Sequence, residues 1–199
     1  MRHKDRILVG IENRKILVIA ALESEFKSSK NFEIPIYYSG VGKINAARLT
    51  TELIINYDPD LIINVGTVGS LQQNLEGFIY IRDVVEHDMN AFPLAPRGVA
   101  PFELDKSKFS SVYGEYRCAT GDSFITAVDP WLVASDVDVV DMELFSIAKV
   151  CCNYGIEWLS IKYISDYTND SSGDEWLGSL NTLSREFEAK ILDVIERIL

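Results

Sequence analysis

The segment WLSIKYISD, residues 158–166, is mainly apolar over the length of one β-strand. Apolar side chains on both faces of a strand are typical of a sheet that is covered on both sides. Because side chains alternate along a strand, Lys162, Ile164 and Asp166 are predicted to share one face, with Asp166 at the carboxyl edge. The segment therefore predicts a central sheet with helices on both sides and a polar residue at its edge.

Outward from this segment, short runs rich in Val and Ile alternate with longer segments of helical period, as in an α/β layer fold. Helices are predicted at 43–56, 143–154 and 180–199, the last with an apolar stripe along one side. Region 87–108 is marked by prolines and is predicted to be a loop. Residues 1–14 fit either two strands or a short helix and a strand. Strands are predicted at 15–21, 34–40, 60–66, 79–86, 115–119, 137–141 and 157–165.

Size and charge restrict the class of protein. The chain has 199 residues, 47% of them hydrophobic, which is about the size of one ordinary domain. Nineteen Lys and Arg against thirty Asp and Glu give a formal net charge of −11, which repels nucleic acids and anionic membrane surfaces. The N-terminal apolar run is too short for a signal peptide, and no stretch reaches the roughly 18 apolar residues of a membrane span. We therefore expect one domain, residues 1–199, with 1–14 as an extension of uncertain structure, and no nucleic-acid or membrane partner.

Cysteine and histidine are too few for several classes of hydrolase. Cys118, Cys151 and Cys152 suggest neither a disulfide framework nor a metal knuckle, and they favour a reduced, cytoplasmic setting. His3 and His87 have no metal-ligand spacing and do not suggest a catalytic triad. We therefore predict no metal and no other cofactor, and any hydrolytic chemistry must rest on carboxylates.

Acidic residues follow several predicted strands at their carboxyl ends, where open α/β sheets bind ligands. Glu23 and Glu25 follow the strand at 15–21, and either could face a site or merely begin a helix. Glu143 stands where a strand gives way to a helix, and a carboxylate there could accept two hydrogen bonds from a vicinal diol or simply start the helix. Asp166 could act in a site or as a turn residue. A lysine buried at Lys162 needs a carboxylate partner, which could be purely structural.

Two glycine-rich turns are predicted, SGVGK at 39–43 and NVGTVGS at 64–70, each after a strand and before a helical pattern. Bare backbone at such turns can approach a ligand, although neither turn matches a P-loop or a dinucleotide-binding motif. In TGDSFIT, residues 120–126, Phe124 could stack on a flat base or simply pack in the core. The residues alone leave these alternatives open.

Six segments together are more specific than any one of them. AALESE, SGVGK, PDLIINVGTVGSL, TGDSFI, VDMELFSIAKVC and ISD resemble, in order and in approximate spacing, motifs of the nucleoside phosphorylase/nucleosidase superfamily. From Lys15 to the C-terminus, the chain looks most like the methylthioadenosine/S-adenosylhomocysteine nucleosidases. The resemblance implies a three-layer α/β/α single domain with a central mixed sheet. It also implies a homodimer that hydrolyses the N-glycosidic bond of adenine nucleosides in nucleoside catabolism and methionine salvage.

The same resemblance implies roles for single residues. Glu25 corresponds to the residue that activates the attacking water, and Asp166 to the acid that protonates the leaving adenine at N7. Such a pair suits an oxocarbenium-like transition state, which needs a neutralised leaving group on one side and water on the other. Phe124 and Ile125 correspond to the adenine contacts. The other substrate contacts that the resemblance implies are Leu22, Val41, Thr67, Gly69, Met142, Glu143, Lys162 and Ser165.

The chain departs from the family pattern at three places. Lys162 stands where the nucleosidases usually have an arginine near the water, and it is a point donor without the planar fork of arginine. The segment between Phe26 and Tyr37 is shorter than the usual hairpin. The loop at 89–102 resembles a compressed dimer loop, in which Phe92 would close the 5′ pocket of a neighbouring chain.

Three alternative functions follow from the same residues. Futalosine hydrolase or another purine nucleosidase would differ mainly in the 5′ pocket. A phosphorylase would need arginines and a glycine-rich anion site for phosphate, whereas Glu25 would repel that anion. A catalytically weak nucleoside-binding protein is the third alternative, which the presence of both Glu25 and Asp166 disfavours.

Overall fold

A computed structural model of the protein describes residues 14–27, 29–103, 107–127, 129–169, 172–173 and 183–198. Apart from Arg14, the predicted extension 1–14 lies outside the described residues, as do 180–182 and Leu199 of the last predicted helix.

Each predicted strand is present, within a few residues of its expected bounds, and two short elements are additional. The strands are β1 (Ile16–Ala20), β2 (Ile36–Tyr38), β3 (Leu61–Ser70), β4 (Phe78–Glu86), β5 (Lys108–Ser110), β6 (Tyr116–Thr120), β7 (Val139–Asp141) and β8 (Glu157–Asp166). The helices are α1 (Lys43–Tyr57), α2 (Pro130–Ala134), α3 (Leu144–Tyr154) and α5 (Ser184–Ile198). The sequence did not predict β5 or α2, because neither is long enough to show a periodic pattern.

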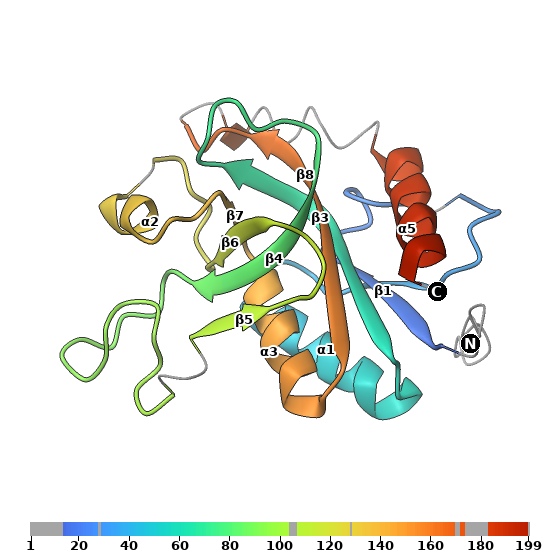
Figure 1. The fold of residues 1–199 in the computed structure, drawn as a ribbon, viewed down its shortest axis with the longest axis horizontal. Coiled ribbons are helices and arrows are strands. Elements are labelled where there is room, and N and C mark those ends of the chain that lie inside the picture. The colour runs from blue at the N-terminus through green and yellow to red at the C-terminus, as the bar shows by residue number, and fades with distance from the viewer. Residues whose placement is uncertain are drawn as a thin grey trace.

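The strands form one mixed sheet, part of which closes on itself. The sheet has eight strands in the order β2-β1-β3-β7-β6-β4-β5, and β8 pairs with both β3 and β4. β8 runs parallel to β3 and antiparallel to β4, so the pairings β3–β7–β6–β4–β8 lead back to β3. Figure 1 shows β3 and β8 side by side, the two longest strands of the sheet.

Helices cover both faces of the sheet, as predicted (Figure 1). Successive residues of β1 point to opposite sides: Leu17 belongs to the apolar cluster that includes α1 and α3, whereas Val18 belongs to the cluster that includes α5. Phe187 and Ile191 of α5 are fully buried in that second cluster. Two separate apolar clusters on one sheet confirm the three-layer α/β/α prediction. None of the helices in the described ranges combines enough length and apolar character to cross a bilayer.

One of the two predicted glycine turns is a strand instead. β3 continues through NVGTVGS to Ser70, and no helix follows it before β4. Tertiary pairing overrides the turn tendency of glycine, because β8 pairs with β3 up to Gly69 and β7 pairs with its last two residues. The other prediction is confirmed: SGVGK forms a turn with positive φ at Gly40 and Gly42, and its last residue, Lys43, begins α1.

Candidate active site

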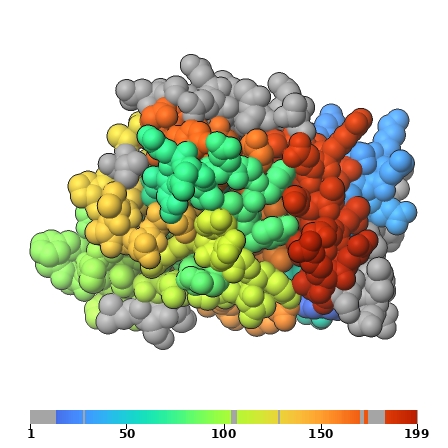
Figure 2. All heavy atoms as spheres, turned by 45° about the horizontal axis from the view of Figure 1, so that its top comes forward, coloured from blue at the N-terminus to red at the C-terminus, as the bar shows by residue number. Residues whose placement is uncertain are grey.

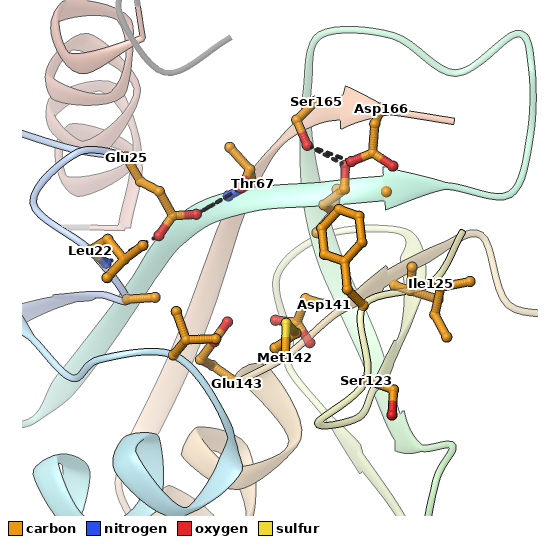
Figure 3. A pocket seen from close by; sticks show the side chains of 16 residues that line it. Leu22, Glu25, Thr67, Ser123, Ile125, Asp141, Met142, Glu143, Ser165 and Asp166 are labelled. Carbon is orange, nitrogen blue, oxygen red and sulfur yellow. Dashed lines mark hydrogen bonds between the residues drawn. The ribbon is translucent and has the colours of Figure 1, made fainter. Parts of the chain in front are cut away.

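A cavity of about 190 Å³ lies where the carboxyl ends of β1, β3 and β8 meet the segments that follow β6 and β7. Ligands of open α/β sheets bind at such carboxyl ends. Of the predicted site residues, all but Phe92 and Lys162 line this cavity (Figure 3). These lining residues are Leu22, Glu25, Val41, Thr67, Gly69, Phe124, Ile125, Met142, Glu143, Ser165 and Asp166.

Glu25 forms one wall from the turn that follows β1, and only 6% of the residue is exposed. Its Oε1 accepts hydrogen bonds from the backbone N–H of Thr67 (3.2 Å) and from Thr67 Oγ1 (2.7 Å). Its Oε2 accepts one from the backbone N–H of Leu22 (3.2 Å). Three donors that converge on its two oxygens therefore fix the position of this carboxyl group in the cavity wall. The alternative acid, Glu23, is exposed and lies 3.6 Å from Lys27.

Asp166 lies on the opposite side of the cavity from Glu25, at the end of β8 (Figure 3). It is 3% exposed. Its Oδ1 accepts a hydrogen bond from the backbone N–H of Thr168 (3.1 Å), and its Oδ2 accepts one from Ser165 Oγ (2.9 Å). Two carboxylates, one in the turn after β1 and one at the end of β8, therefore face one cavity, each with its own set of donors.

An irregularity in the pairing of β3 with β8 brings Ser165 and Asp166 to the cavity together. The register shifts between Val68 and Gly69, so that Gly69 pairs with Asp166 and Ser165 is passed over. The strict alternation predicted from Lys162 to Asp166 therefore breaks one residue before the end of the strand. Glycine is needed opposite this point, because a Cβ on Gly69 would lie 2.9 Å from Asp166 Oδ1.

Glu143 precedes α3 and is 8% exposed. Its Oε1 accepts a hydrogen bond of 2.9 Å from the backbone N–H of Gly42, in the turn before α1. Burial raises the pKa of Glu143 to about 7, helped by the charge of Asp141 and opposed by that of Lys162. This carboxyl group therefore changes its charge near neutral pH.

Lys162 does not line the cavity, although the family resemblance implied a substrate contact. It is 1% exposed, and its Nζ lies 2.8 Å from Asp141 Oδ2. Burial lowers the pKa of Lys162, but the negative charges of Asp141 and Glu143 raise it by more than burial lowers it. The pKa therefore lies above its ordinary value. The predicted carboxylate partner of Lys162 is thus Asp141, which itself lines the cavity. Asp141 also accepts hydrogen bonds from Thr120 Oγ1 and from the backbone N–H of Leu144.

Phe92 also lies outside the cavity lining. It is 83% exposed in the long segment between β4 and β5. This segment projects from the body of the molecule at the left edge of Figure 1 and Figure 2. The role expected for Phe92 concerned a neighbouring chain.

The remaining wall follows β6 and contains residues that sequence reasoning missed. Phe124, which is 47% exposed, and the half-buried Ile125 line it together with Ser123. Ser123 stands inside the quoted TGDSFIT segment, and Asp141 directly follows two valines and precedes Glu143 by two positions. Asp141, a polar residue at the end of a predicted strand, was detectable by that position, and Ser123 by its place in the quoted motif. Within the described ranges, no group of three or more His, Cys, Asp and Glu is placed to hold a metal ion.

Comparison with known sequences gives consistent matches over most of the chain. A family model described as the phosphorylase superfamily matches residues 23–199. A 5′-methylthioadenosine/S-adenosylhomocysteine nucleosidase of Bacillus subtilis is 32% identical over 216 aligned positions, which cover 94% of this chain and 91% of the relative. The enzyme of the same name from Staphylococcus haemolyticus is 29% identical and covers 82% of each chain.

Solved structures with the same fold include nucleoside hydrolases of Helicobacter pylori. A variant of its nucleosidase MTAN, with 5′-methylthioadenosine in the active site, has a TM-score of 0.79 at 23% identity and covers 94% of this chain and 99% of that one. Its futalosine hydrolase has a TM-score of 0.78 at 22% identity and covers 92% and 97%. At this level of identity the likeness shows the shared fold alone.

Proposed function

This chain belongs to the phosphorylase superfamily and, within it, to the methylthioadenosine/S-adenosylhomocysteine nucleosidase family, and from that premise we propose that it releases adenine from nucleosides. The proposed substrates are adenine nucleosides with a thioether at the 5′ position, such as 5′-methylthioadenosine and S-adenosylhomocysteine. Their N-glycosidic bond would be hydrolysed without a cofactor, in one nucleosidase domain formed by residues 1–199.

The observation that carries this proposal is the pair of buried carboxylates on opposite sides of one cavity (Figure 3). In the proposed reaction, Asp166 gives its proton to N7 of adenine as the bond between C1′ and N9 breaks. Glu25 takes a proton from water while the water oxygen forms a bond to C1′. Adenine and the free sugar leave, and the proton on Glu25 returns through solvent to Asp166.

Glu143 is proposed to hold the ribose. Its carboxyl lies beside the same cavity and uses Oε1 to accept the Gly42 N–H. A carboxylate suits the 2′- and 3′-hydroxyls because it accepts two hydrogen bonds from neighbouring donors. Met142 is proposed to contact the sugar, and Thr67 and Gly69 are proposed to lie beside the sugar and the attacking water.

The base and the 5′ group are proposed to occupy the rest of the lining. Phe124 would stack on adenine, and the backbone of Ile125 would form hydrogen bonds with it. Ser165 would support Asp166 through the hydrogen bond that it already donates. Leu22 and Val41 are apolar residues of the cavity lining and suit a thioether substituent.

Hydrolysis is favoured over phosphorolysis by the charge of the cavity. Among the described residues that line it, four are carboxylates and none is Lys or Arg. The neighbouring Lys162 is already paired with Asp141. A phosphate dianion would face repulsion from Glu25 without a compensating cation, whereas neutral water would not.

We further propose a cytoplasmic homodimer, in which the projecting loop at 89–102 contacts a second copy. Three large apolar side chains in this loop are strongly exposed: Phe92 (83%), Leu94 (74%) and Phe102 (97%). Apolar side chains exposed together often mark an interaction surface. Phe92 would then contribute to the 5′ pocket of the neighbouring chain.

The test is release of adenine from 5′-methylthioadenosine by the purified chain, first at enzyme excess and then under turnover. The same reaction in phosphate buffer should yield the free methylthio sugar and no sugar 1-phosphate. Binding of nucleoside with no release of adenine would reject the enzymatic proposal. Preference for futalosine in a substrate panel would move the activity to that hydrolase.

A further inference from the structure

We propose that Lys43 is a positioning residue, which fixes the base-side wall of the cavity by holding three carboxylates that converge on it. These four residues, Lys43, Glu86, Asp88 and Asp122, are called the Lys43 cluster. The proposal rests on the proposed function only for the identity of the ligand that the wall binds.

The Lys43 cluster joins three segments that are distant in the sequence. Lys43 is the first residue of α1, Glu86 is the last residue of β4, and Asp122 follows β6. The Lys43 ammonium contacts the carboxylates of Glu86 and Asp88 and lies 3.8 Å from Asp122 Oδ2. Its side chain is 17% exposed. This ammonium is therefore largely enclosed by acids rather than by solvent.

Asp88 connects the Lys43 ammonium to the backbone of the base-side wall through its two carboxylate oxygens. One of its oxygens, Oδ1, accepts from the Lys43 ammonium, while Oδ2 accepts the backbone N–H of Asp122 at 2.7 Å. The backbone N–H of Lys43 in turn donates to Asp122 Oδ1 at 2.8 Å. Asp122 is thus held through both its backbone and its side chain. The cavity-lining residues Ser123 and Phe124 come directly after it.

The same end of α1 also holds the opposite side of the cavity. Gly42, the residue before Lys43, donates its backbone N–H to Glu143. Two successive amides at the start of α1 thus bind two carboxylates, one on the proposed ribose side and one on the proposed base side. Displacement of this helix end would therefore disturb the spacing between the two walls.

Charge explains why the lysine is needed. Burial lowers the pKa of Lys43, but hydrogen bonds and charges of Asp88 and Glu86 raise it above its ordinary value. The pKa of Asp88 is lowered against its own burial, first by the hydrogen bond from Lys43. Without the ammonium, the largely buried carboxylates of Glu86 and Asp88 and the more exposed carboxylate of Asp122 would repel one another. Asp88 would also lose the partner that orients it toward Asp122.

The variant Lys43→Met should therefore loosen the wall while leaving the acid and the water-activating group in place. We expect KM for the nucleoside to rise on the order of tenfold and kcat to change by less than about threefold. Lys43→Arg keeps a cation among the three acids and should recover most of the affinity. Asp88→Asn is a second variant, because it replaces one of the two accepting oxygens with an NH2 group, which cannot accept a hydrogen bond from Lys43 or from the Asp122 N–H.

Lys149→Met is the matched control, since Lys149 also forms a partly exposed ion pair, at 2.7 Å with Glu103, but lies outside the cavity lining. Hydrogen–deuterium exchange reports on the wall directly and does not depend on catalysis. Amides at 121–125 should exchange about tenfold faster in Lys43→Met and Asp88→Asn than in the wild type. Their exchange rates should be unchanged in Lys149→Met.

Unchanged exchange at 121–125 in both cluster variants would overturn the proposal, as would a loss confined to kcat with KM unaltered. Failure of the proposed function has a different signature. A wild-type chain that never releases adenine would reject the nucleosidase activity, while the exchange comparison would still decide whether Lys43 holds the wall.

Discussion

Glu25 and Asp166 differ in the groups that surround them, and this difference suits separate tasks. Glu25 accepts two backbone N–H bonds and one hydroxyl bond, whereas Asp166 accepts one backbone N–H and the Ser165 hydroxyl. The proposed base is thus held by three donors and the proposed acid by two, so each carboxyl group is oriented by its own set of neighbours.

Asp166→Asn and Glu25→Gln keep size and shape but remove proton transfer. Each should lower kcat for adenine release on the order of ten-thousand-fold, about 5 kcal/mol of barrier. Asp166→Asn should still bind nucleoside, which calorimetry would measure. Glu52→Gln, an equivalent change on the exposed side of α1, serves as control. Near-native release of adenine by Asp166→Asn would show that another group protonates the base.

Glu143 should give the reaction a dependence on pH near neutrality. Its pKa is raised to about 7, so its carboxyl is mainly protonated below that pH and ionised above it. If the ionised form binds the ribose hydroxyls, kcat/KM should rise with pH through about 7 in the wild type. Glu143→Gln should lower both affinity and rate and should remove this limb of the pH profile. An identical limb in the variant would assign it to another group.

At the scale of elements, the Lys162–Asp141 pair links β8 to β7 across the closed part of the sheet. Asp141 also receives a hydrogen bond from Thr120 at the end of β6. Side chains from three strands, β6, β7 and β8, therefore meet at one buried ion pair two residues before Glu143. The side chains of Lys162 and Asp141 are 2% and 1% exposed, so neither charge has solvent as a substitute partner.

Lys162→Met should consequently destabilise the fold strongly, because it leaves Asp141 buried without its cation. The expected loss is about 3–5 kcal/mol in the free energy of unfolding by urea. Lys149→Met removes a partly exposed pair and should cost less than about 1 kcal/mol. Equal losses in the two variants would mean that solvent or rearrangement compensates Asp141.

At the scale of the whole molecule, the projecting loop at 89–102 is proposed to make a second copy of the chain necessary for full activity. Phe92→Asp should shift the sedimentation of the protein from dimer toward monomer at micromolar concentration and should raise KM. Ile55→Asp is the control, since Ile55 is also exposed (67%) but lies on α1. A wild-type chain that is monomeric at full turnover would exclude the dimer.

Local pattern alone was sufficient for most of the framework. Runs of Val and Ile such as KILVIA and LIINV predict strands. Successive side chains of a strand point to opposite faces, and a sheet covered on both sides buries both sets. The family resemblance carried by six ordered motifs likewise indicated residues that line the cavity. Several of these residues lie at or after the carboxyl end of a strand, where an α/β sheet binds its ligands.

Contacts between distant residues decided what the sequence could not indicate. β3 extends through its glycines because β8 and β7 pair with it. Lys162 pairs with Asp141, among several acids in the sequence, because β7 and β8 both pair with β3 and their side chains come together there. The acids around Lys43 come from the ends of two other strands. Spacing along the chain describes only near neighbours, whereas the energy of a buried charge depends on which groups the fold places within a few ångströms of it.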